Sequence, residues 1–65
     1  MFEEYVGKSV KVVYQDANSN KAIRGLVTDT SDLFLDLKQE NGDLASIRIS
    51  EIITIKTEDS GNYAV

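Results

Sequence analysis

The sequence predicts an all-β protein: a small, strongly bent antiparallel barrel of five strands, preceded by a short N-terminal helix. Two observations support this prediction. Apolar and polar residues alternate through most of the chain, at the period of a strand with one buried face. Clusters of Asn, Asp, Ser and Gly interrupt that alternation at short intervals, which is typical of tight turns. Five short segments joined in this way favour a meander that rolls up into a barrel.

The composition limits what can stabilise so small a fold. The chain has 65 residues, which is one domain at most. It contains no Cys and no His, so disulfides and zinc sites built on thiolate or imidazole are excluded. Small domains usually depend on a disulfide, a metal or a partner chain. We therefore expect copies of this chain to associate, and we expect no cofactor.

The net charge and the lengths of the apolar stretches limit the partners and the cellular compartment that can be expected. A net charge of −4 opposes extended nonspecific contact with nucleic acid, which relies on many Lys and Arg contacts to phosphate. No apolar stretch is long enough to span a bilayer and no signal peptide is visible, so a cytoplasmic protein without membrane contact is expected. Without His or Cys the commonest catalytic bases and nucleophiles are missing, which disfavours an enzyme.

Residues 1–7 are predicted to form one or two helical turns. Phe2, Tyr5 and Val6 have the i, i+3, i+4 spacing of one helix face, and Gly7 is a suitable C-terminal stop. A helix this short is unstable alone. Its apolar face is therefore expected to dock on the barrel, which spans residues 8–56.

The first two strands are predicted over residues 8–16 and 21–30, with a turn at residues 17–20. A glycine inside a strand weakens it unless the chain bends or another backbone approaches closely. Gly25 therefore indicates a bend in the second strand. The alternation places Val10, Val12 and Tyr14 on one face of the first strand, and Ile23, Gly25 and Val27 on one face of the second.

A tight turn is predicted at residues 29–32, Asp-Thr-Ser-Asp, and a third strand over residues 33–38. Its alternation places Leu33, Leu35 and Leu37 inward. Phe34 should then point away from the interior.

The rest of the chain is predicted to complete the barrel. A hairpin turn at residues 39–43 contains Asn-Gly, the strongest short hairpin signal. A fourth strand over residues 44–49 and a one-turn corner at 50–51 lead to a fifth strand, residues 52–56, which crosses back onto the first strand. Residues 57–65 are expected to be a flexible tail of this single domain.

The fourth and fifth strands carry apolar residues on both faces. An exposed edge strand of this kind is an aggregation hazard, whereas a closed ring of copies pairs every edge. We therefore expect an interface between subunits. The candidate interface residues are Leu44, Ile47, Ile49, Ile52, Ile53 and Ile55.

The order of these parts resembles the Sm-like (LSm- and Hfq-type) family over residues 2–56. Gly25 and Val27 match the first family motif, and Ile47-Arg48 matches the Ile-Arg of the second. The sequence departs from the family where the Asp-Thr-Ser-Asp turn is one residue short. Phe34 stands at the position of a base-contacting Asn, and Ile49 at the position of a Gly.

The resemblance implies a homo-oligomeric ring of five to eight subunits in which the fourth strand of each pairs with the fifth strand of its neighbour. It further implies that short single-stranded RNA is bound near the central opening of the ring. Phe34 and Arg48 would make the main contacts. The other candidate RNA-binding residues, from the turn and the corner, are Ser31, Asp32 and Ser50.

Each candidate has a structural alternative. Phe34 either stacks on a base or covers a subunit interface, and the interface is the simpler explanation. Arg48 either contacts RNA or forms an ion pair with an acidic residue. Ser50 is better explained as a cap of the corner turn. The possible ion-pair partners of Arg48 are Asp29, Asp32, Asp36 and a neighbour's Glu51.

The three aspartates in and near the second turn do not form a convincing cation site. Calcium takes six to eight oxygen ligands, commonly from a loop with a glycine bend, and this turn has neither. The aspartates are better explained as turn residues that hydrogen-bond their own backbone. The first functional hypothesis is therefore an RNA-binding ring of the RNA-chaperone type. The alternative is a scaffold ring that binds protein and no RNA.

Overall fold

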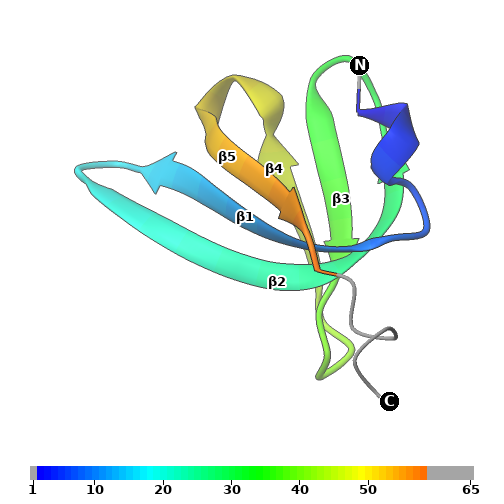
Figure 1. The fold of residues 1–65 in the computed structure, drawn as a ribbon. Coiled ribbons are helices and arrows are strands. Elements are labelled where there is room, and N and C mark those ends of the chain that lie inside the picture. Colours follow the sequence, from blue (N-terminus) through cyan, green and yellow to red (C-terminus); the bar gives the residue numbers. More distant parts are fainter. Residues whose placement is uncertain (1, 59–65) are drawn as a thin grey trace.

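The computed structural model describes residues 2–58, which form one antiparallel five-stranded sheet with two short 3₁₀ turns (Figure 1). The all-β prediction is confirmed. The elements in chain order are η1 (Glu3–Tyr5), β1 (Ser9–Asp16), β2 (Ser19–Thr30), β3 (Phe34–Lys38), β4 (Leu44–Arg48), η2 (Ile49–Glu51) and β5 (Ile52–Thr57).

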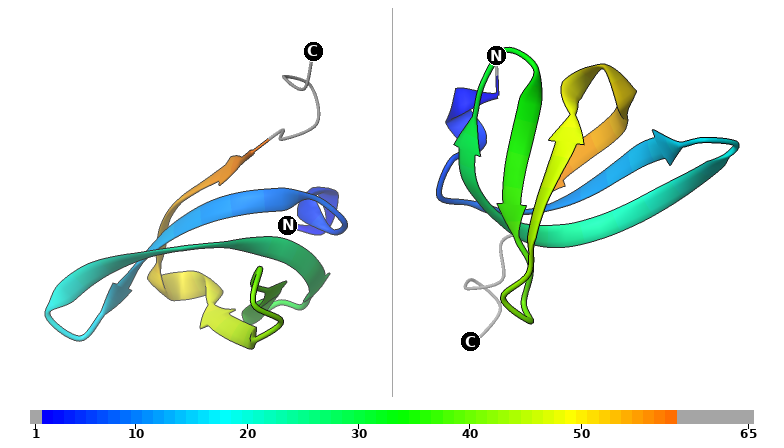
Figure 2. Two further views of the ribbon diagram at one scale, coloured as in Figure 1. Left: turned by 90° about the horizontal axis from the view of Figure 1, so that it is seen from below. Right: turned by 180° about the vertical axis from the view of Figure 1, so that it is seen from behind.

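The strands are ordered β4-β3-β2-β1-β5. The fifth strand therefore returns to the first, as the sequence predicts. The sheet is strongly bent but open, because β4 and β5 lie at its two edges and do not pair with each other (Figure 2). Closure of the barrel is thus not confirmed for the single chain.

The bend lies where β2 changes partner. This strand pairs with β1 from Ser19 to Leu26 and with β3 from Leu26 to Thr30. At Gly25 the two strands come so close that a Cβ atom would lie 2.8 Å from the carbonyl oxygen of Lys38. A side chain at this position would collide with backbone, so the absence of one is what permits the approach.

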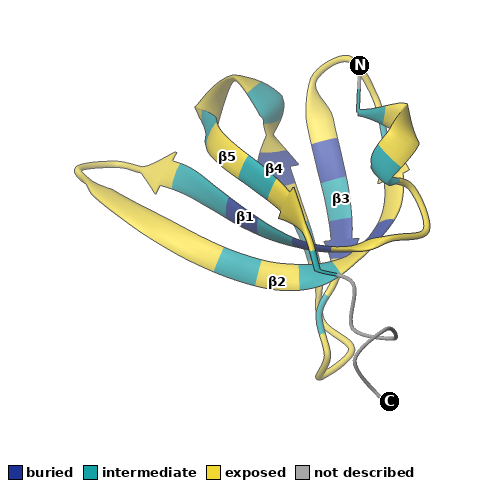
Figure 3. Ribbon diagram, viewed as in Figure 1, coloured by how far each residue is buried: buried dark blue, intermediate teal, exposed yellow. Residues whose placement is uncertain are grey.

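The core lies on the concave face of the sheet (Figure 3). The alternation of β1, β2 and β3 supplies most of it, as predicted, but Leu33 is a correction. It is 65% exposed, because it lies in the connection before β3 and not in the strand. The buried core residues are Val10, Val12, Val27, Leu35, Leu37 and Ile47. The partly buried residues around them are Phe2, Tyr5, Tyr14, Ile23, Ile49, Ile52 and Ile55.

The first hairpin turn is shorter than predicted. Only Ala17 and Asn18 lie outside the strands, and Ala17 adopts a positive φ of 58°. An ion pair of 2.9 Å joins Lys21 to Asp16 beside this turn, and the hydrogen bond to Asp16 raises the pKa of Lys21. The second hairpin is as predicted, with Gly42 at a φ of 92°.

The N-terminal segment forms one 3₁₀ turn over Glu3–Tyr5, the lower limit of the one or two helical turns predicted over residues 1–7. The rings of Phe2 and Tyr5 lie 5.8 Å apart and pack on the core, which confirms the predicted docking for these two side chains. Val6 stays 44% exposed. Gly7 ends the turn and donates a hydrogen bond of 2.8 Å to the carbonyl oxygen of Val27.

The C-terminal boundaries also shift. Ile49 belongs to η2, which begins one residue earlier than the predicted corner, and Thr57 belongs to β5. The amide of Glu58 donates to the carbonyl oxygen of Ser9 at 2.7 Å. The rest of the predicted flexible tail, residues 59–65, lies outside the described residues. In the described part of the chain, no helix has the length and apolar character needed to cross a membrane.

Candidate functional site

The most distinctive exposed pair of side chains is Phe34 on β3 and Arg48 on β4. The two residues lie directly opposite each other in the β3–β4 register. The guanidinium carbon of Arg48 is 5.8 Å from the centre of the Phe34 ring, and the residue Phe34 is 39% exposed. This is a cation–π contact at the surface, worth about 0.5–1 kcal/mol.

The alternation of the two strands directs this pair outward. The next pair in the register is Leu35 with Ile47, and both residues are buried in the core. Successive side chains of a strand point to opposite faces. Phe34 and Arg48 must therefore project from the other face, as the sequence predicts.

Ser31 fixes the backbone on which Phe34 stands. Its hydroxyl oxygen accepts hydrogen bonds from the amides of Leu33 and Phe34, at 3.3 and 3.2 Å. Its own amide donates to the carbonyl oxygen of Phe34 at 2.9 Å. Ser31, a candidate RNA contact, is therefore engaged in turn chemistry and acts on the site through the position of Phe34.

The other two candidates of the turn and the corner are exposed. Asp32 and Ser50 make no side-chain hydrogen bond or ion pair within residues 2–58. The capping role expected of Ser50 is wrong, since the residue at the N-cap of η2 is Arg48 and no side chain caps the turn. The amide of Ile49 donates to the carbonyl oxygen of Leu33 at 2.8 Å, which joins the end of β4 to the start of β3.

Within the described residues, Arg48 forms no ion pair with Asp29, Asp32 or Asp36. Asp36 instead accepts a hydrogen bond of 2.6 Å from the hydroxyl of Ser46, its cross-strand partner. Asp29 accepts one of 2.8 Å from the amide of Thr30. No three carboxylates in the described ranges come together in a way that could hold a metal ion.

The contact between Asp36 and Ser46 lies on the same face as Phe34 and Arg48, one pair further along the hairpin. The sequence did not single out Ser46. The signal was the alternation of β4, which places Ser46 two residues before Arg48.

The candidate interface residues divide into three groups. Leu44 and Ile53 are 76% and 51% exposed on the edge strands and are free to meet another copy. Ile47 belongs to the core of its own chain, so its assignment to an interface is corrected. The half-buried residues that pack against that core are Ile49, Ile52 and Ile55.

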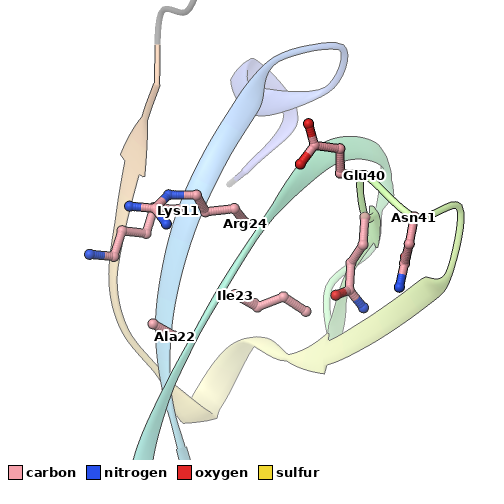
Figure 4. A pocket seen from close by; sticks show the side chains of 7 residues that line it. Lys11, Ala22, Ile23, Arg24, Glu40 and Asn41 are labelled. Carbon is pink, nitrogen blue, oxygen red and sulfur yellow. The ribbon is translucent and has the colours of Figure 1, made fainter.

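A separate groove of about 610 Å³ lies at the other end of the β3–β4 hairpin (Figure 4). Lys11 and Arg24, from β1 and β2, line it together with Glu40 and Asn41 of the second hairpin turn. The sequence did not predict this groove, because it depends on a turn that folds back beside β2 from far along the chain.

No protein-family model, curated protein or solved structure matches this chain. The chemical capacity of the site therefore follows from its geometry. A flat aromatic ring and a planar cation on a firm hairpin end can stack on a flat ligand and contact an anion.

Proposed function

We propose that this chain is the subunit of an Sm-like ring that closes its barrel through neighbouring copies and binds single-stranded RNA. The observation that carries the proposal is the exposed cation–π pair of Phe34 and Arg48. The fold supports it, because the open sheet has two free edges and the fifth strand lies beside the first.

The free edges are suited to pairing between copies. β4 and β5 each have one unpaired edge, and each carries an exposed apolar residue, Leu44 or Ile53. Pairing β4 of one copy with β5 of the next would satisfy both edges and cover these side chains. The resemblance to the Sm-like family sets the expected size at five to eight copies.

The ligand contact would combine stacking with charge. A base stacked on Phe34 contributes about 1–3 kcal/mol, and Arg48 would add contact to the base or to phosphate. One such contact is weak. A ring repeats it at short intervals, so that binding at one subunit raises the effective concentration of RNA at the next.

The test is a titration of short oligouridine and oligoadenine RNA at low salt, followed by fluorescence anisotropy. Phe34→Leu removes the aromatic ring and Arg48→Gln removes the charge, and each should weaken binding at least about fivefold, the lower end of the range of about 1–3 kcal/mol for a lost stacking contact. Lys21→Gln is the matched control for charge, because Lys21 lies by the first hairpin turn and pairs with Asp16. It should leave the affinity within about twofold of the wild type.

The second candidate function is a scaffold ring that binds protein and no RNA. The net charge of −4 favours it, since a polyanion is repelled by such a chain. An assembled ring that binds neither oligonucleotide, even at low salt, would overturn the RNA proposal and leave the scaffold. Binding that both Phe34→Leu and Arg48→Gln leave intact would place the RNA elsewhere.

A further inference from the structure

We propose that the convex face of β5, β1 and β2 binds a short acidic peptide segment of a partner protein through three cations, Lys56, Lys11 and Arg24. We call these three residues the basic row. The proposal goes beyond the RNA site, because the basic row contains neither Phe34 nor Arg48 and does not depend on the assembly of several subunits.

The strand register builds the basic row. Lys11 of β1 lies directly opposite Lys56 of β5 on one side and Arg24 of β2 on the other. Residues opposite one another across paired strands share a face, and neighbouring strands are about 4.8 Å apart. Figure 4 shows Lys11 and Arg24 extending in the same direction from their strands. Three of the chain's seven basic residues thus stand in one line.

Such a line is costly without an anion. Like charges directly opposite each other across a strand pair are destabilising. Within residues 2–58, neither Lys11 nor Lys56 forms an ion pair, while Lys21 pairs with Asp16 and Arg24 with Glu58. Two adjacent ammonium groups therefore remain uncompensated in a chain that is acidic overall. Like charges that lie opposite each other without a compensating anion are unfavourable for folding, and such an exception is typical of a functional surface.

One end of the row already holds a carboxylate. Nε of Arg24 lies 3.0 and 3.1 Å from the two carboxylate oxygens of Glu58. The backbone amide of Glu58 is fixed by its bond to Ser9, so the carboxylate is delivered from the end of β5. The basic row can therefore bind a carboxylate of a peptide at the surface. Its two lysines could bind further carboxylates of the same peptide.

The side chains around the row favour a peptide over a nucleic acid. The residues next to it on the same face of β1, β2 and β5 contain no aromatic ring. Single-stranded nucleic acid is held by stacking on aromatic side chains combined with many phosphate contacts. This face offers only two cations without an ion-pair partner in the described residues, and no aromatic side chain. The neighbouring residues of the convex face are Ser9, Val13, Ala22, Leu26 and Thr54.

The groove beside Arg24 extends this surface. Lys11 and Arg24 both line it, and the exposed Leu26, two residues after Arg24 on the same face of β2, gives a peptide an apolar contact next to the charged ones. A segment with carboxylates and an interspersed aliphatic residue would match both features. A short segment also carries few charges, so the net charge of −4 repels it less than a long polyanion.

The experiment is an NMR titration at low salt with a terminally blocked hexapeptide, Glu-Glu-Val-Glu-Glu-Val. The amide signals of Lys11, Arg24 and Lys56 should shift, and the Gln-Gln-Val-Gln-Gln-Val peptide should not move them. Lys11→Gln and Lys56→Gln should each weaken binding by about two- to fivefold, the range expected of an exposed ion pair. Glu58→Gln should strengthen it, because Arg24 is then free to bind the peptide.

Lys21→Gln is the matched control. It removes the same charge, and the register places Lys21 opposite Tyr14, on the other face of the sheet from the row. Its affinity should equal that of the wild type. Equal binding of the acidic and neutral peptides would overturn the proposal, as would no binding at all. If a single-stranded oligonucleotide moves these signals and the acidic peptide does not, the assigned class of partner is wrong.

Discussion

At the scale of single residues, two positions show how far the sequence determines the backbone. Gly25 was predictable from its place in an apolar strand, because a glycine there indicates a close approach, and the structure places a carbonyl oxygen where its side chain would be. Ala17 was not predictable. The turn contains Asn and Ser, residue types that tolerate the left-handed conformation, but Ala17 adopts it, since the strand register on both sides decides where the turn falls.

Gly25→Ala should destabilise the fold by about 1–3 kcal/mol, because the added methyl group meets the backbone of Lys38 and the strands must move apart. Urea unfolding at matched protein concentration measures this. The control is Gly42→Asn, at a position where no atom lies within 4 Å of a Cβ, so that only the strain of the positive φ remains, and Asn bears that strain better than most residues. Its cost should be at most about 1 kcal/mol. Equal stability of Gly25→Ala and the wild type would show that the β2–β3 approach is not tight.

At the scale of elements, the alternation located all five strands and failed at their ends. A strand with one buried face repeats every second residue, so Val10, Val12, Leu35 and Leu37 were assigned to the core correctly. Leu33 fits the same alternation but lies before β3, in the connection that Ser31 holds in place. Hydrogen bonds across the hairpin determine where a strand begins and ends, and the apolar periodicity of the sequence does not predict those bonds.

The turn before β3 can be tested by comparing two serines. Ser31→Ala removes the acceptor for the amides of Leu33 and Phe34 and should lower the free energy of unfolding by about 1 kcal/mol. It should also speed hydrogen exchange at the Phe34 amide. Ser50→Ala is the control, because no hydrogen bond of the Ser50 hydroxyl holds η2 in place. Equal effects of the two substitutions would mean that Ser31 does not position Phe34.

At the scale of the whole molecule, the sequence predicted the strand order but left closure open. The six buried core residues all lie within one chain, and Ile47, assigned to an interface from its sequence, is one of them. What the single chain leaves unsatisfied is the outer edge of β4 and the outer edge of β5. The edges could pair with each other, pair with a second copy or face solvent. The hydrophobic pattern alone does not distinguish these three cases, because the apolar residues on β4 and β5 are the same in each.

The edges themselves supply the decisive experiment on assembly. Size-exclusion chromatography with light scattering should give a mass of several chains for the wild type. Leu44→Lys and Ile53→Lys each place a charge on one edge and should release single chains, because a buried unpaired charge opposes strand pairing between copies. Leu33→Lys is the control, since Leu33 is equally apolar and 65% exposed but lies outside both edge strands. A folded monomeric wild type at micromolar concentration would exclude the ring and with it any RNA affinity that depends on repeated contacts. The basic row would remain, because one chain contains all of it.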